Sequence, residues 1–164
     1  MAYRNKTYVI FDGDSDMWAY AYMKGWKSNE NLDFNFYDAH DLRPLTDRAS
    51  DETIYRRLRE RFSSAKQVIV LVGDNTKSLR KFVRWELEIA LELALPIIAV
   101  CLNGARGIDV NRCPPILKNE YVVHVPFTAA IIQHALDYFP GDYASRTESG
   151  PRYYTAKTYM DLGL

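Results

Sequence analysis

Residues 67–103, which read QVIVLVGDNTKSLRKFVRWELEIALELALPIIAVCLN, decide the fold class of this chain. The run QVIVLVG (67–73) is continuously apolar, as strands are when a parallel sheet buries them on both faces. The run LPIIAVCLN (95–103) has the same character and predicts a second buried strand. Between them, residues 79–94 carry apolar side chains at helical spacing. Strand, helix and strand in this order predict a right-handed crossover within a parallel sheet.

The flanking sequence repeats the same alternation of strand and helix. Strands are predicted over 7–11, 33–38 and 121–125, and helices over 14–27, 50–65 and 127–139. After the fourth strand, residues 104–120 predict a loop in which a helix is absent or reduced to a turn. The pattern predicts an α/β fold with a doubly wound five-stranded parallel sheet in the flavodoxin-like order 2-1-3-4-5. We expect one domain over 1–140 and a C-terminal extension or tail over 141–164.

Composition excludes several classes of protein. The 164 residues suffice for one domain with its own core, and 21 basic residues balance 21 acidic ones. We therefore expect no nucleic-acid partner and no membrane association. Cys101 and Cys113 have neither a disulfide nor a zinc-site spacing, which favours a reducing, cytoplasmic location.

The predicted strand order also predicts a binding crevice. Its switch point lies between the first and third strands, and ligands of such sheets bind outside the carboxyl ends of the strands. Residues 11–16 and 73–78 are expected there. The loop AHDLRPLTDRAS (39–50) is longer than a plain connection needs, which also favours binding.

Glu86 does not fit the pattern of its predicted helix. It falls in the middle of the arc formed by Leu79, Phe82, Val83, Ala90, Leu93 and Ala94. Arg80, Lys81, Arg84, Glu88 and Glu92 fall on the opposite face. Burying an ionised carboxylate is costly, so Glu86 pairs with an arginine such as Arg56 or Arg57, rotates toward solvent, or faces a pocket.

Other polar residues favour structural roles. Nucleotide-binding glycine motifs and the usual hydrolase, zinc and thiol-redox motifs are absent from the sequence. Asp12, Asp14 and Asp16 lack the rest of a calcium loop and suit a turn, and no metal site is expected. His40, His124 and His134 are scattered. Trp85 is better explained by packing on a neighbouring helix than by stacking on a ligand.

Three stretches carry a resemblance to a known family. They are YVIFDGDSD (8–16), LDFNFYDAHDL (32–42) and the block VIVLVGDNTKSLRKFVRWELEIALELALPIIAVCLN (68–103). Together they resemble the bacterial TIR-like domains of Thoeris anti-phage sensors, over roughly residues 6–139. In TIR domains a buried strand, a polar turn and a helix carrying an aromatic residue and a glutamate follow one another.

The resemblance implies a function and a set of site residues. Catalytic TIR domains cleave the nicotinamide–ribose bond of NAD⁺, and Thoeris members make a cyclic ADP-ribose-type signal that activates a downstream effector. NAD⁺ would then be a substrate and no cofactor is expected; self-assembly into a homo-oligomer is also implied. Glu86 would be catalytic. The predicted substrate contacts are Phe11, Asp12, Gly13, Asp14, Asp38, Asp74, Ser78 and Trp85.

Two other functions are compatible with the same sequence. A non-catalytic TIR-like interaction module would use the loop and the tail for assembly, with Glu86 as a structural ion-pair partner. A nucleoside deoxyribosyltransferase-like enzyme shares the architecture and uses a glutamate nucleophile. The fold alone does not decide among the three.

Overall fold

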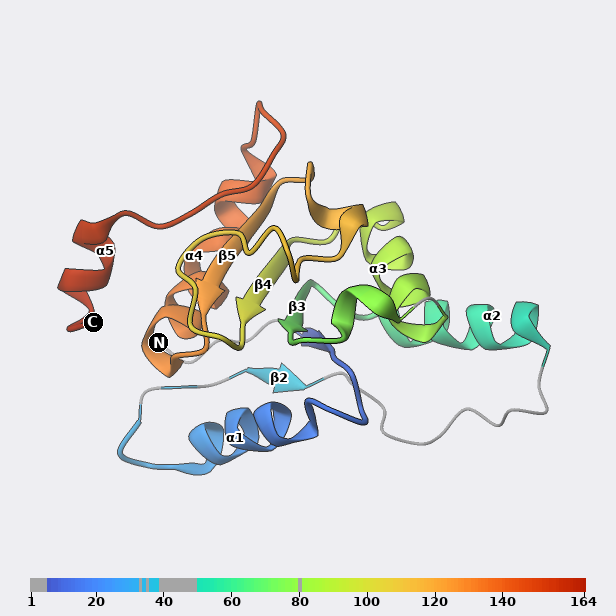
Figure 1. The fold of residues 1–164 in the computed structure, drawn as a ribbon, viewed down its shortest axis with the longest axis horizontal. Helices are drawn as coiled ribbons and strands as arrows, with labels where there is room; N and C mark the ends of the chain where they lie inside the picture. The colour runs from blue at the N-terminus through green and yellow to red at the C-terminus, as the bar shows by residue number, and fades with distance from the viewer. Residues whose placement is uncertain (1–5, 33, 35, 39–49, 80) are drawn as a thin grey trace.

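A computed structural model describes residues 6–32, 34, 36–38, 50–79 and 81–164 (Figure 1). The strands are β1 (Lys6–Ile10), β2 (Tyr37–Asp38), β3 (Gln67–Val72), β4 (Ile97–Cys101) and β5 (Val122–Pro126). The helices are α1 (Met17–Ser28), α2 (Asp51–Phe62), α3 (Phe82–Glu92), α4 (Ala129–Ala144) and α5 (Ala156–Asp161). Two short 3₁₀ helices, η1 (Thr76–Ser78) and η2 (Pro115–Leu117), complete the described elements.

The strands form one parallel sheet in the order β2-β1-β3-β4-β5. Every pair of neighbouring strands is parallel, and Val9 of β1 lies opposite Ile69 of β3. The predicted α/β fold with a parallel sheet is therefore confirmed. β2 covers only the end of the strand predicted over 33–38. The connection from β4 to β5 holds only η2, as expected for a helix reduced to a turn.

Helices cover both faces of the sheet. On one face α1 and α4 pack over alternate side chains of β1, β3, β4 and β5, including Val9, Ile69 and Ile98. On the other face α2 and α3 pack over the intervening side chains, including Tyr8, Val68 and Val70. All six residues of β3 are buried, because it lies centrally and both its faces are covered.

α3 is shorter than its apolar pattern predicts. The polar turn after β3 forms η1, and the α-helix begins only at Phe82. It ends at Glu92, and Ala94 takes a positive φ of 52° and is exposed. The prediction that Leu79 and Ala94 belong to the helix was wrong, because the chain turns sharply at both ends of the segment. Val83 and Ala90 are buried, as predicted, and Glu86 is buried between them, which rules out its rotation toward solvent.

The C-terminal residues pack against the sheet. α4 continues through Pro140 to Ala144, beyond the predicted end at 139, at the cost of one helical hydrogen bond. Phe139 and Tyr143, one turn apart, both contact the ring of Tyr121, which holds the helix together past the proline. Arg152 then pairs with the edge strand β5: its N–H donates to Val122 O (2.8 Å), and its carbonyl accepts from His124 N (3.0 Å).

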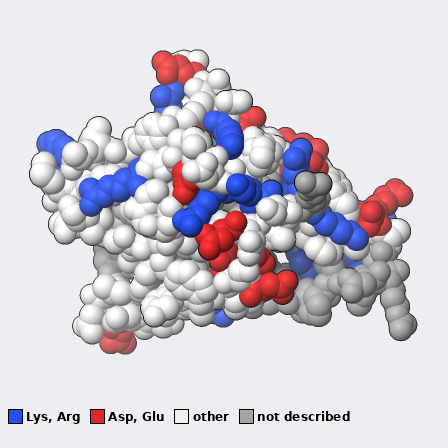
Figure 2. Space-filling view, viewed as in Figure 1, with Lys and Arg blue, Asp and Glu red and all other residues white. Residues whose placement is uncertain are grey.

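The surface has no dominant sign of charge on the face drawn in Figure 2, where basic and acidic side chains lie interspersed. Among the described residues, none of the helices combines the length and apolar composition that crossing a bilayer requires.

Candidate functional site

Two polar turns meet at the carboxyl ends of β1 and β3. In the turn after β3, the buried Thr76 hydroxyl accepts from Gly73 N (2.9 Å) and donates to Leu71 O (3.2 Å). In the turn after β1, Asp12 Oδ1 accepts from Asp14 N (3.0 Å). The Asn75 side-chain amide donates to Ser15 Oγ (3.2 Å) and joins the two turns. These contacts fix the switch point of the sheet, where open α/β folds bind ligands.

A cavity of about 320 Å³ opens beside these turns and beneath the start of α3. This Glu86 cavity is lined by Phe11, Asp12, Gly13, Asp14, Ser78, Leu79, Lys81, Phe82, Val83 and Glu86. Its size lies within the usual range for small-molecule sites, and its wall combines apolar side chains with a few polar groups.

Glu86 is the buried carboxyl group of the cavity wall. It lies in the second turn of α3 with a side chain only 7% exposed. Its Oε2 has no hydrogen-bond partner within the described part of the chain. Burial raises the pKa of Glu86 to about 7, although the neighbouring Tyr8 hydroxyl and the positive charge of Arg61 lower it. Glu86 therefore changes its charge near neutral pH, as a residue engaged in acid–base or electrostatic catalysis requires.

The structure brings together six of the predicted site residues. Phe11, Asp12, Gly13, Asp14 and Ser78 all line the Glu86 cavity with Glu86 itself. They come from the turn after β1 and from η1, which the strand order places side by side. The predicted juxtaposition with the start of α3 is thus present for residues 11–14, whereas Ser15 and Asp16 line a second cavity.

Asp74 lies outside the Glu86 cavity. Its side chain turns toward β4, where its Oδ1 lies 2.8 Å from a guanidinium nitrogen of Arg112. There it lines a second cavity, of about 430 Å³, together with Ser15, Asp16, Trp18, Gly73, Asn75, Leu102, Asn103 and Arg112. The predicted grouping of Asp74 with Glu86 is therefore not found, because the turn after β3 sends Asp74 and Ser78 to opposite sides.

Asp16 packs directly on Gly73. Its side chain is 5% exposed, and its pKa is raised, first by burial and then by the charges of Asp12 and Asp74. A Cβ added to Gly73 would lie 2.4 Å from Asp16 Oδ2. With the Asp16 side chain in this position, residue 73 has no room for a Cβ, and a larger residue there would displace the Asp16 carboxyl group.

We expect Gly73→Ala to reduce the free energy of unfolding by about 1–3 kcal/mol, because the new methyl group displaces the buried Asp16 side chain. Urea denaturation at pH 7 measures this change. Gly13→Ala is the matched control, since its Cβ would meet no atom within 4 Å, and it should cost less than about 0.5 kcal/mol. Equal effects of the two substitutions would contradict this packing.

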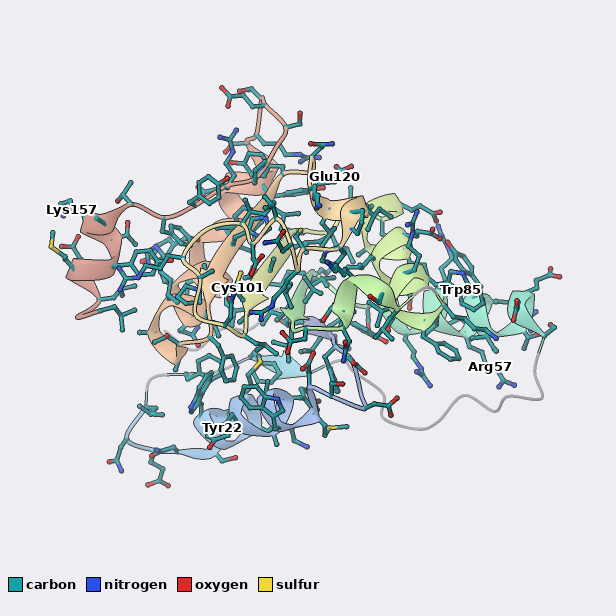
Figure 3. The ribbon with its side chains drawn as sticks, in the orientation of Figure 1. Tyr22, Arg57, Trp85, Cys101, Glu120 and Lys157 are labelled. Carbon is teal, nitrogen blue, oxygen red and sulfur yellow. The ribbon has the colours of Figure 1, made fainter. Side chains whose placement is uncertain are left out.

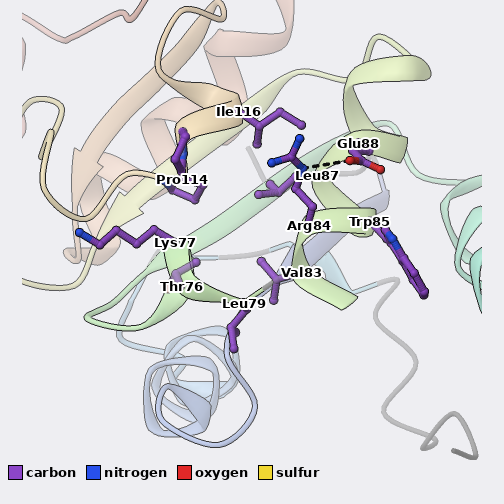
Figure 4. Close-up of a pocket in the computed structure, with 11 residues that line it drawn as sticks. Thr76, Lys77, Leu79, Val83, Arg84, Trp85, Leu87, Glu88, Pro114 and Ile116 are labelled. Atoms are coloured by element: carbon purple, nitrogen blue, oxygen red, sulfur yellow. Dashed lines mark hydrogen bonds and ion pairs between the residues drawn. The ribbon is translucent and has the colours of Figure 1, made fainter. Parts of the chain in front are cut away.

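Trp85 also lies outside the Glu86 cavity. One residue before Glu86, it is rotated about 100° around the helix and packs edge-on against Tyr55 of α2, with ring centroids 6.0 Å apart. The interpretation that it packs on a neighbouring helix is confirmed. Trp85 also borders a third cavity, of about 410 Å³. Figure 4 shows this cavity between the segment that holds Pro114 and Ile116 and helix α3, which carries the Arg84–Glu88 ion pair.

Asp38 ends β2, where it pairs in register with Thr7 of β1. Its side chain and residues 39–49, which make up nearly all of the predicted binding loop, lie outside the described residues.

The expected pairing of Glu86 with Arg56 or Arg57 is not found among the described residues. Both arginines are exposed, and Figure 3 shows Arg57 on the outer side of α2. The positive charge that lowers the pKa of Glu86 belongs to Arg61, one helical turn beyond Arg57. The sequence held a signal for Arg61, because Arg61 follows Ile54 by seven residues and so falls on the apolar stripe of α2. Tyr8 gave no such signal, since a buried aromatic residue is ordinary in a strand.

The two described histidines, His124 and His134, do not line the Glu86 cavity, and His40 lies outside the described residues. His124 is 1% exposed within β5, and burial lowers its pKa to about 4, so the imidazole is neutral at pH 7. His134 packs against Tyr138 and Tyr154. Within the described residues, no group of three or more histidine, cysteine, aspartate or glutamate side chains could hold a metal ion.

The sequence matches a known protein family. Residues 8–107 match the family described as "Thoeris protein ThsB, TIR-like domain". The matched region runs from β1 through β4 and includes the whole Glu86 cavity. No curated protein matches the sequence significantly.

Proposed function

We propose that this chain, which belongs to the TIR-like domain family of Thoeris protein ThsB, cleaves the bond between nicotinamide and ribose in NAD⁺. Membership of the family indicates a role in anti-phage defence. The observation that supports catalysis is a single one: Glu86 is a buried carboxyl group on the wall of a cavity at the switch point, and it titrates near pH 7. A carboxyl group that served only to hold the fold would not need to border a cavity.

The reaction suits a single carboxylate. When the bond between ribose C1′ and the nicotinamide nitrogen breaks, its electron pair stays on nicotinamide, which leaves as a neutral molecule. Positive charge develops on the ribose, as in the oxocarbenium-like transition state of glycoside hydrolysis. An ionised Glu86 beside C1′ would stabilise that charge, most strongly where the cavity excludes water.

The fate of the ribosyl centre decides the product. Addition of water gives ADP-ribose and releases a proton. Attack by a hydroxyl group or an adenine nitrogen of the same molecule gives a cyclic product and also releases a proton. In this proposal the product is a cyclic ADP-ribose-type signal that activates a downstream effector. Phe11, Leu79 and Phe82 supply the apolar wall that would limit the access of water.

Nicotinamide release tests the proposal. The purified protein is incubated with NAD⁺, alone and with lysate from phage-infected cells, because a defence sensor can require a trigger. Nicotinamide and the nucleotide product are separated by chromatography and identified by mass spectrometry. We expect nicotinamide release in at least the triggered sample. If folded protein released none under both conditions, a non-catalytic interaction module would be the better description.

A further inference from the structure

The second cavity, which Asp74 and Arg112 line, is separate from the Glu86 cavity and lies at the carboxyl ends of β1, β3 and β4. Its volume is about 430 Å³, within the usual range for small-molecule sites. Residues from the segments 15–18, 73–75 and 102–112 form its wall. The bond cleavage at Glu86 makes no use of this cavity, so its lining has to be explained in another way.

Trp18 is the aromatic residue of the wall. It lies in the first turn of α1 and is 48% exposed. Its indole meets the ring of Phe127 nearly at a right angle (83°), with the ring centroids 5.5 Å apart. This contact supports the indole and leaves about half of its surface open. An open indole on the wall of a cavity suits the stacking of a flat heteroaromatic ring such as a nucleobase.

Hydrogen bonds hold the polar side chains of the wall in place. Asp109 Oδ1 accepts from the N–H groups of Asn111 (2.9 Å) and Arg112 (3.2 Å). Asp109 Oδ2 accepts from the side-chain amide of Asn103 (2.8 Å). The Arg112 guanidinium also pairs with Asp74 (2.8 Å). The wall is therefore organised before a ligand binds, which reduces the entropic cost of binding.

The charges of the wall restrict the ligand. Among the described residues that line the second cavity, the charged ones are Asp16, Asp74 and Arg112, and Asp74 already neutralises Arg112. Asp16 is 5% exposed, and its Oδ2 has no hydrogen-bond partner within the described part of the chain. A phosphate group here would face Asp16 without a free cation to offset the repulsion. The cavity suits an uncharged ligand with hydroxyl or amino donors.

We propose that the second cavity binds the adenosine part of NAD⁺, with adenine on Trp18 and the ribose hydroxyls directed at Asp74 and Asn75. This inference rests on the proposed function. Asp14 lines the Glu86 cavity and Ser15 lines the second cavity. Because the Cα atoms of consecutive residues are about 3.8 Å apart, the two cavities are neighbours on either side of one turn, and a dinucleotide can enter both.

The chemistry of NAD⁺ assigns its two halves to the two cavities. Nicotinamide riboside must reach Glu86 for its glycosidic bond to break. Adenosine, which is uncharged at pH 7 and carries a flat base and ribose hydroxyls, then matches the second cavity. The pyrophosphate between the halves would cross the turn at Asp14 and Ser15. Both residues are exposed there, so that water and salt screen the phosphate charges from Asp14.

Binding of adenosine to the complete protein tests the inference without catalysis. The indole N–H signals of the three tryptophans are followed by NMR after ¹⁵N labelling, and the Trp18 signal is assigned by its loss in Trp18→Phe. We expect adenosine to shift the Trp18 signal and to leave that of Trp85, which lies outside both cavities. We expect AMP to bind no more tightly than adenosine. Tighter binding of AMP would show recognition of phosphate and would overturn the inference.

Affinities from calorimetry add a comparison of variants. Trp18→Ala should weaken the binding of adenosine about tenfold, because it removes the stacking surface. Tyr138→Ala is the matched control, since Tyr138 is also an exposed aromatic residue (60%) but lies on α4 and lines neither cavity. Equal affinities of wild type and Trp18→Ala for adenosine would contradict the proposed site, as would an unmoved Trp18 signal.

Kinetics provides the second measurement. Trp18→Ala should raise the KM for NAD⁺ about tenfold and keep kcat within about twofold, because adenosine is held equally in the ground state and the transition state. A lower kcat with an unchanged KM would count against a binding role. If the wild-type protein cleaved no NAD⁺, the proposed function would fail, whereas the adenosine titration would still decide whether the second cavity binds a nucleoside.

Discussion

Replacing Glu86 by glutamine should remove a large part of the pH dependence of stability. The folded-state pKa of Glu86 is about 7 and its ordinary value is 4.5, so between these values the folded state binds more protons than the unfolded state. The free energy of unfolding of the wild-type protein must then fall as pH rises through this window. Over about 2.5 pKa units the loss approaches about 3 kcal/mol. In Glu86→Gln this contribution is absent.

Urea denaturation at pH 4.5 and at pH 8 measures the effect. From pH 4.5 to pH 8, the free energy of unfolding of Glu86→Gln minus that of wild type should increase by about 3 kcal/mol. Glu88→Gln is the control, since Glu88 is partly exposed and pairs with Arg84 at 2.9 Å on the same helix. It should show little of this change. A parallel pH dependence of wild type and Glu86→Gln would show that Glu86 ionises normally, and would contradict its buried environment.

The second large effect concerns activity. If an ionised Glu86 stabilises the ribosyl cation, glutamine at this position should slow NAD⁺ cleavage by about a thousandfold, because charge stabilisation in a desolvated site is a major part of catalysis. Glutamine keeps the size and shape of the side chain. The loss of activity should therefore appear as a lower kcat, and the variant protein should remain folded. Nicotinamide release under the triggering conditions measures the rate.

Glu88→Gln and Glu92→Gln are matched controls on the same helix. Glu92 lies beyond the cavity and pairs with Arg59 at 2.5 Å, on a surface where both side chains are about half exposed. Both controls should retain activity within about twofold, because neither residue lines the Glu86 cavity. Equal losses in all three variants would indicate a general effect of helix α3 and would contradict a specific role for Glu86.

The fold was predictable because the spacing of apolar residues along the sequence indicates which faces of the strands and helices are buried. The run at 67–73 is almost entirely apolar, because both faces of β3 are covered. This strand and its neighbours in the sequence indicated a parallel sheet. The ends of α3 were less predictable. Residues 79–81 continue the helical pattern, but the turn held by Thr76 and the 3₁₀ helix η1 delays the α-helix until Phe82.

The site was predictable in part, for the same reason. A charge on an apolar stripe marks Glu86, and the strand order brings Phe11, Asp14 and Ser78 to its cavity. Trp85 and Asp74 stand close to these residues in sequence and yet face elsewhere. One step along a helix turns a side chain by about 100°, and one turn residue can point to either side of a sheet. Such directions depend on tertiary contacts that a sequence pattern does not contain.

The charges near Glu86 show what a comparison of two helices adds. Arg61 is a cation on the apolar stripe of α2, and Glu86 is an acidic residue on the apolar stripe of α3. Since α2 and α3 cover the same face of the sheet, the topology places the two charged residues on facing helices, and the charge of Arg61 lowers the pKa of Glu86.

Nicotinamide release by folded Glu86→Gln protein distinguishes a carboxyl group that is buried for catalysis from one that only supports the fold. In one preparation at pH 8, the variant should be as stable as wild type or more so, and it should release no nicotinamide from NAD⁺ above background while wild type does. Nicotinamide release by Glu86→Gln at the wild-type rate would contradict the account.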